Sequence, residues 1–170
     1  MAKTKEIFHE CRSAGRTFTS EEWGEYCRES RDDDAKRLRT QIGKYLFNDC
    51  DICLNPEVMS LVVDGKSYGV YVVIKWADCG NGFWASAIDY AYGNGGGGSG
   101  VCYADRPVSE KYSCFAGYRS EKDAKVAACD RALRLLADKK GDKVVRLIRM
   151  VEDYRKSLSR PQIVQLELFG

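Results

Sequence analysis

Histidine is almost missing from this sequence: His9 is the only one in 170 residues. A Ser-His-Asp or Cys-His arrangement needs an imidazole held between two partners, and no partner set accompanies His9 in its segment. The acidic run Asp32–Asp34 does not replace it, because three adjacent carboxylates at an expected helix break point in different directions. We therefore predict no catalytic residues and a protein that is not an enzyme.

Long apolar runs are missing as well. No stretch approaches the roughly 20 apolar residues that a membrane-spanning helix needs, and the opening MAKTKEIFHE lacks the apolar core of a signal peptide. The eight cysteines are scattered along the chain, and in a cytoplasmic protein they are expected as reduced thiols. These absences predict a cytoplasmic protein with no membrane partner.

The cysteines also lack the pattern of a complete metal site. Cys50 and Cys53 have the spacing of half a zinc site, but no second pair follows, and His9 would have to come from far away. The run Gly93–Gly100 contains a literal Gly-x-Gly-x-x-Gly, yet it follows an expected antiparallel strand and opens no helix. We expect no metal, no cofactor and a flexible hairpin loop at these glycines.

What the sequence does contain is a regular helical stretch at Arg119–Lys140. Ser120 suits the N-cap position, acidic residues follow it in the first turn, and Gly141 is placed to end the helix. One stripe of the helix must be buried, because apolar residues recur at helical spacing. The stripe consists of Ala124, Ala127, Ala128, Ala132, Leu135 and Leu136.

The chain before this helix changes period at about residue 48. Thr19–Glu22 has the pattern of a capping box, so we predict a helix from there to about Ser30 and a second helix over Ala35–Phe47. After residue 56 the pattern becomes β-branched and is interrupted by turn residues, with Asp64-Gly65 placed as a hairpin turn. The predicted strands are Ser60–Val63, Lys66–Trp76, Phe83–Tyr92 and Tyr112–Tyr118.

A final helix is predicted from Asp142, with Val144, Leu147, Ile148, Val151 and Tyr154 on one stripe and Pro161 ending it. The order of elements predicts an α+β fold, in which an antiparallel meander of three to four strands carries helices on one face. We divide the chain into an N-terminal helical segment (1–47), an α+β domain (48–160) and a flexible C-terminal tail (161–170).

Charge is distributed unevenly along the chain. Residues 119–170 hold 13 Lys and Arg against 8 Asp and Glu, whereas residues 1–118 hold 14 against 17. A basic C-terminal part is compatible with a polyanion partner, and also with solvated helix faces on an ordinary globular domain. Lys139, Lys140 and Lys143 are candidate nucleic-acid-binding residues in this part.

The motif Ser120-x-Lys122-x-Ala124-Lys125-x-Ala127-Ala128-x-x-x-Ala132-Leu133 resembles the last helix of double-stranded RNA-binding domains. The resemblance extends loosely over residues 67–136. It implies that Lys122 and Lys125 contact phosphates of a duplex, and that the protein recognises the shape of the duplex rather than its sequence. Glu121 departs from it, since the family usually has a third lysine there, and Ala77–Gly82 lacks the proline and histidine of the family's groove-binding loop. Alternatively, the alanines serve only to pack a helix closely on a sheet.

The tail contains Gln165-Leu166-Glu167-Leu168-Phe169. This pentapeptide resembles the motif Q-L-(S/D)-L-F with which bacterial proteins dock on the replicative sliding clamp, and it departs only at Glu167. The resemblance implies that Leu168 and Phe169 enter a pocket, Leu166 fills a neighbouring groove and Gln165 supplies hydrogen bonds. A chain end beyond a proline suits such a linear motif, although the same apolar residues could pack on the protein's own sheet as an edge strand.

Three hypotheses for function follow from these patterns. The first is an accessory protein of bacterial, phage or mobile-element DNA metabolism that docks on the sliding clamp. The second is a module that binds duplex nucleic acid through the basic C-terminal helices. The third is a protein inhibitor that acts by occupying another protein's surface.

Overall fold

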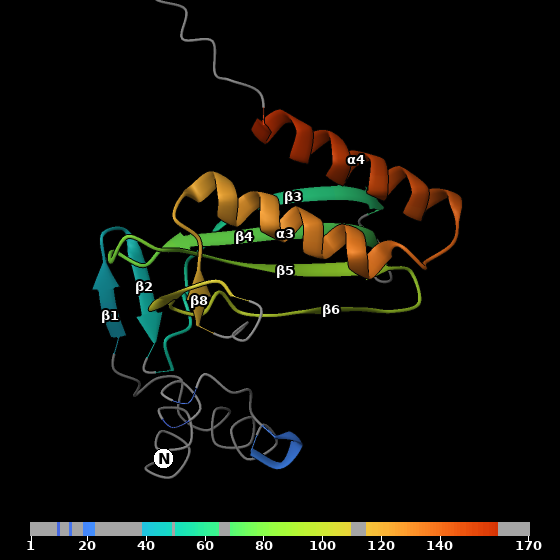
Figure 1. Ribbon diagram of the computed structural model, residues 1–170. Helices are drawn as coiled ribbons and strands as arrows, with labels where there is room; N and C mark the ends of the chain where they lie inside the picture. Colours follow the sequence, from blue (N-terminus) through green and yellow to red (C-terminus); the bar gives the residue numbers. More distant parts are fainter. Residues whose placement is uncertain are drawn as a thin grey trace, which may run out of the picture.

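The computed structural model describes residues 10, 14, 19–22, 39–48, 50–64, 69–109 and 115–159. Within them, a four-stranded antiparallel sheet carries two helices on one face (Figure 1). The predicted α+β class, with helices packed on one side of an antiparallel meander, is confirmed. The sheet strands, in spatial as in chain order, are β3 (Glu57–Asp64), β4 (Val70–Asp78), β5 (Trp84–Tyr92) and β6 (Gly96–Gly98).

Strand β4 lies inside the sheet and is paired on both sides. It pairs with β3 from Trp76 opposite Glu57, and with β5 along its whole length from Val70 opposite Tyr92. Alternate residues of β4 face the helices, as the period of a strand requires. These buried residues are Val70, Val72, Ile74 and Trp76.

Both predicted C-terminal helices are present on that face. In α3 (Glu121–Leu136) the Ser120 hydroxyl accepts the backbone N–H of Asp123 at 3.0 Å, so Ser120 caps the helix as expected. The buried residues of α3 are Ala124, Ala128, Cys129, Ala132 and Leu136, and those of α4 (Asp142–Ser159) are Val144, Leu147 and Val151. Helix α3 contacts β4 and β5, while α4 contacts β3 and β4, so the two helices together cover strands β3, β4 and β5.

The helix predicted over Ala35–Phe47 is wrong in its described part. Strands β1 (Arg39–Ile42) and β2 (Tyr45–Asn48) form an antiparallel hairpin instead, with Gly43 in the turn at φ +56°. Tyr45 and Phe47, two residues apart, are both buried. Burial of every second residue is typical of a strand rather than a helix. Strand β2 also crosses the predicted boundary between the N-terminal helical segment (1–47) and the α+β domain (48–160).

The prediction that Gly93–Gly100 is only a hairpin loop is also wrong, because β6 forms within it. Gly96, Gly97 and Gly98 pair with Ala91, Tyr90 and Asp89 of β5. A side chain is excluded at Gly96, where a Cβ atom would lie 2.3 Å from the carbonyl oxygen of Tyr90. Glycine therefore permits this close approach of two strands.

The strand predicted over Tyr112–Tyr118 is much shorter where the structure describes it. Only β8 (Ala116–Gly117) forms, and it pairs in parallel with β7 (Arg106–Pro107). Gly117 lies so close to Ala104 that a Cβ atom there would be 2.6 Å from the Cβ of that alanine. Close packing of Gly117 against Ala104, rather than a long strand pairing, therefore determines the backbone conformation at β8.

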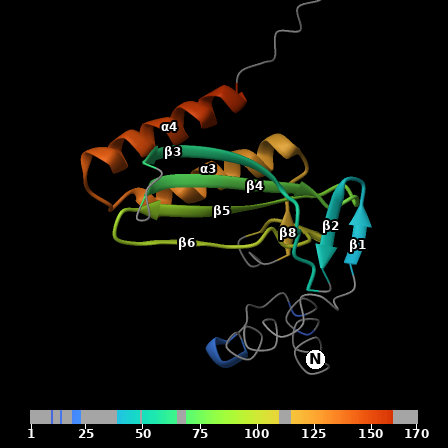
Figure 2. The same cartoon turned by 180° about the vertical axis from the view of Figure 1, so that it is seen from behind.

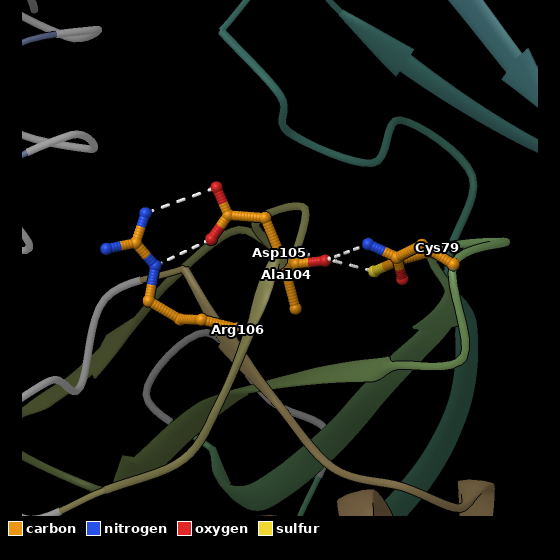
Figure 3. A network of polar contacts seen from close by, with 5 residues as sticks. Cys79, Ala104, Asp105 and Arg106 are labelled. Carbon is orange, nitrogen blue, oxygen red and sulfur yellow. Dashed lines mark hydrogen bonds and ion pairs between the residues drawn. The ribbon is translucent and has the colours of Figure 1, made fainter.

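A second, smaller core lies under the hairpin β1–β2. The Cys79 thiol accepts a hydrogen bond from the backbone N–H of Ala104 at 3.2 Å, and burial raises the pKa of this thiol (Figure 3). Next to it, the Asp105 carboxylate pairs with the guanidinium of Arg106 (Figure 3). The buried residues of this second core are Tyr45, Phe47, Cys53, Ala77, Cys79, Phe83, Ala85, Ala87, Val101 and Ala104.

The predicted capping box is confirmed. The Thr19 N–H donates to the Glu22 carboxylate at 2.7 Å, and the Glu22 N–H donates to the Thr19 hydroxyl at 3.2 Å. The predicted continuation to Ser30 lies outside the described residues. None of the helices in the described ranges has the length and apolar character needed to cross a membrane.

Two neighbouring residues of α4 test how the helix is held on the sheet. Leu147 is fully buried, so Leu147→Ala should lower the free energy of unfolding by about 2–5 kcal/mol. Val145 is 45% exposed, so Val145→Ala should change it by no more than about 0.5 kcal/mol. Urea unfolding followed by circular dichroism measures both, and equal losses would contradict the observed packing of α4.

Candidate functional site

The predicted nucleic-acid-binding lysines fall into two groups at opposite ends of α3. Lys122 and Lys125 lie in its first two turns, whereas Lys139 and Lys140 follow its end and Lys143 lies in the first turn of α4. A helix of 16 residues is about 24 Å long, because each residue adds about 1.5 Å. The five lysines therefore do not form one patch.

Lys125 is held by the protein's own groups. Its ammonium forms an ion pair with Glu121 one turn earlier and lies 4.1 Å from the ring centroid of Trp76. Only 17% of the side chain is exposed. The ion pair stabilises the first turns of α3, and the contact with Trp76 links the helix to β4, so Lys125 is largely unavailable to a phosphate.

The surroundings of Lys125 balance its charge further. Glu57 accepts a hydrogen bond from the Tyr45 hydroxyl at 2.9 Å and forms an ion pair with Lys44. The hydrogen bond from Lys44 holds the pKa of Glu57 below its usual value. The pKa of Tyr45 is raised, mainly by burial and also by its hydrogen bond to Glu57. Two carboxylates thus accompany two ammonium groups, and the start of α3 is not a site of excess positive charge.

The second group of lysines is also partly neutralised. The ammonium of Lys139 pairs with Asp138 at 2.9 Å and lies 5.2 Å from the ring centroid of Tyr92. The hydrogen bond from Lys139 lowers the pKa of Asp138. Lys143 pairs with Asp64 at the end of β3 at 2.5 Å. Lys140 is exposed, and among the described residues it has no ion pair.

Two arginines that were not singled out from the sequence continue this second group. Arg146 and Arg149 are exposed on α4, at intervals of three residues from Lys143. The regular spacing from Lys140 to Arg149 is the signal that could have identified them. Within the ranges that the structure describes, neither arginine has an ion pair with an acidic residue.

The sheet face opposite the helices carries a shallow hollow. Figure 2 shows this face without a helix over it, and the hollow has a volume of about 930 Å³. Small residues, Ala91 and Gly96–Gly98, are part of its lining. The Asp89 carboxylate, also in the lining, is bound by the Lys75 ammonium at 2.8 and 2.9 Å. The lining residues include Val62, Tyr71, Val73, Asp89, Ala91 and Gly96–Gly98.

The described residues do not gather three or more metal-ligating side chains at one point. Cys53, Cys79 and Cys129 are buried free thiols. Burial raises the pKa of Cys129 to about 11, so this thiol is protonated at neutral pH.

The predicted clamp-docking residues Gln165, Leu166, Leu168 and Phe169 lie outside the described residues, which end with Ser159 of α4. No family model matches the chain, and comparison with curated proteins and with solved structures finds no significant match.

The two lysines at the start of α3 should differ in their effect on stability. Lys125→Gln removes the ion pair with Glu121 and the contact with Trp76, and should lower the free energy of unfolding by about 1 kcal/mol. Lys122→Gln removes an exposed charge and should change it by no more than about 0.5 kcal/mol. Thermal and urea unfolding of both variants check this, and a larger loss for Lys122 would contradict the assigned contacts.

Proposed function

We propose that this protein is a non-enzymatic accessory protein of bacterial, phage or mobile-element DNA metabolism that docks on the replicative sliding clamp through Gln165–Phe169. The observation that carries the proposal is the sequence Gln-Leu-Glu-Leu-Phe, which matches the clamp-docking pattern at four of its five positions. Glu167 keeps the negative charge that the family's aspartate has at that position.

The chemistry of the pentapeptide suits a docking motif. Leu168 and Phe169 provide adjacent apolar anchors, and burying such side chains supplies most of the free energy of binding a short peptide. Leu166 lies on the other side of Glu167 and contributes further apolar area, while the Gln165 amide can both donate and accept hydrogen bonds. A short segment that orders on binding is expected to bind with roughly micromolar affinity.

The folded part supports the proposal by providing a fixed base for the motif. Val144, Leu147 and Val151 hold α4 on the sheet, Tyr154 and Leu158 pack against the same core, and the helix ends at Ser159. Five residues, 160–164, separate this end from Gln165. In an extended conformation they span roughly 17 Å, which is enough to present the motif beyond the folded domain.

The rival hypothesis is that the tail packs on the protein's own sheet. Strand β3 is at one edge of the described sheet, and Val58 and Val62 on its helix-free side are 55% and 47% exposed. An apolar segment could pair with this edge. The two hypotheses differ in what the tail contributes to stability, so one pair of substitutions distinguishes them.

The variant Leu168→Ala/Phe169→Ala should lose binding to a purified bacterial sliding clamp and keep the melting temperature of the parent protein. Isothermal titration calorimetry measures the binding and differential scanning calorimetry the melting temperature. Glu167→Ser is the matched control: it restores the family's pattern and should bind at least as well as the parent.

If the tail packs on its own sheet, the double variant should behave differently. Loss of two buried side chains would then lower the free energy of unfolding by about 3–6 kcal/mol, which corresponds to a melting temperature lower by about 6 °C or more. That outcome, together with no clamp binding by the parent protein, would overturn the proposal.

A further inference from the structure

Exposed basic side chains occur at regular intervals along the turn between α3 and α4 and the first half of α4. Lys140, Lys143, Arg146 and Arg149 follow one another at steps of three residues, and all four are exposed. On a helix, residues three apart have Cβ atoms about 5–6 Å apart, so Lys143, Arg146 and Arg149 are consecutive neighbours on its surface. We call these four residues the basic row.

Acidic residues compensate only part of this charge. Asp142 is the single acidic residue between positions 139 and 149. Asp64 pairs with Lys143, but within the described parts of the chain no acidic residue pairs with Lys140, Arg146 or Arg149. This differs from the start of α3, where Glu57 and Glu121 accompany Lys44 and Lys125.

We propose that the basic row binds the phosphate backbone of a nucleic-acid duplex. Lys140, Arg146 and Arg149 have no acidic partner among the described residues, and each can neutralise a phosphate and release its counterion. The site lies at the far end of α3 from Lys122 and Lys125, the positions that the likeness to RNA-binding domains implied. This proposal does not depend on clamp docking by the tail.

The surroundings of the basic row favour a duplex over a single strand or a membrane. Proteins that bind single strands stack bases on aromatic side chains, whereas the large apolar side chain that is exposed between Lys140 and Arg149 is the aliphatic Val145. A helix that lies on a membrane inserts its apolar face, but the apolar residues Val144, Leu147 and Val151 of α4 are buried against the sheet. Phosphate contacts alone predict binding that is independent of sequence and sensitive to salt.

The test compares the full-length protein with Lys140→Gln/Arg146→Gln/Arg149→Gln. Fluorescence anisotropy is measured from 50 to 200 mM salt with two unrelated DNA duplexes, an RNA duplex and a single-stranded DNA. The slope of log affinity against log salt should become shallower by about 2.7 on B-DNA, since each lost phosphate contact contributes about 0.9. Over this range the parent protein should therefore lose about 40-fold more affinity than the variant.

The matched control is Lys122→Gln/Arg131→Gln/Arg134→Gln, which removes the same charge from exposed positions of α3. It should keep the salt dependence of the parent protein. Glutamine is used because it retains a good helix propensity, and circular dichroism checks that both variants remain folded.

Four outcomes would overturn the proposal. The parent protein could fail to bind any duplex at 50 mM salt, or the control variant could lose as much of the salt dependence as the basic-row variant. Tighter binding of the single strand than of either duplex would assign the surface to another nucleic acid. Binding of an acidic protein such as a polyglutamate-rich probe, without binding of duplexes, would assign it to a protein partner.

Comparable binding of both DNA sequences would support phosphate recognition, and the DNA and RNA arms identify the preferred duplex.

Discussion

The packing of α3 on the helix-facing side of β4 is the interaction on which the rest of this structure depends. Val72 and Ile74 are fully buried there, and the small residues Ala124, Ala128 and Ala132 let the helix approach them closely. Because β4 pairs on both sides, it holds β3 and β5 in register. Helix α3 contacts α4 and so also positions the last helix. The apolar area buried in this layer is the main source of the protein's stability.

The same layer explains why basic side chains on the two helices differ in exposure. Lys125 is on the side of α3 that faces Trp76, so its aliphatic chain is covered and its ammonium is committed to Glu121. Arg146 and Arg149 are on the side of α4 that faces away from the sheet, so they remain exposed. Position relative to the buried layer, rather than position in a sequence motif, decides which cations are accessible.

Much of this arrangement could be predicted from the sequence, and the exceptions have physical causes. Helix α3 was predictable because its capping residue and its apolar period agree, α4 because of its apolar period, and β4 because β-branched residues are frequent in Val70–Ile74. The segment Arg39–Phe47 was not, because its apolar spacing fits a helix while Tyr45 and Phe47 are buried by partners that lie over 30 positions later, such as Cys79 and Phe83. Glu121 lies within the motif, one turn before Lys125, but the Trp76 ring comes from β4, so the sequence alone could not show that Lys125 is largely covered.

Helix α4 also places the two proposed binding sites within one short span. Arg149 and Ser159 are ten residues apart, or about 15 Å along the helix, and the connector to Gln165 adds at most roughly 17 Å. If the two partners are joined to each other, binding at one site holds the second partner close to the other site. The effective concentration for the second binding event is then in the millimolar range, because the two sites are connected by so short a segment. Two individually weak contacts would then combine into tight, bivalent attachment without any additional interface.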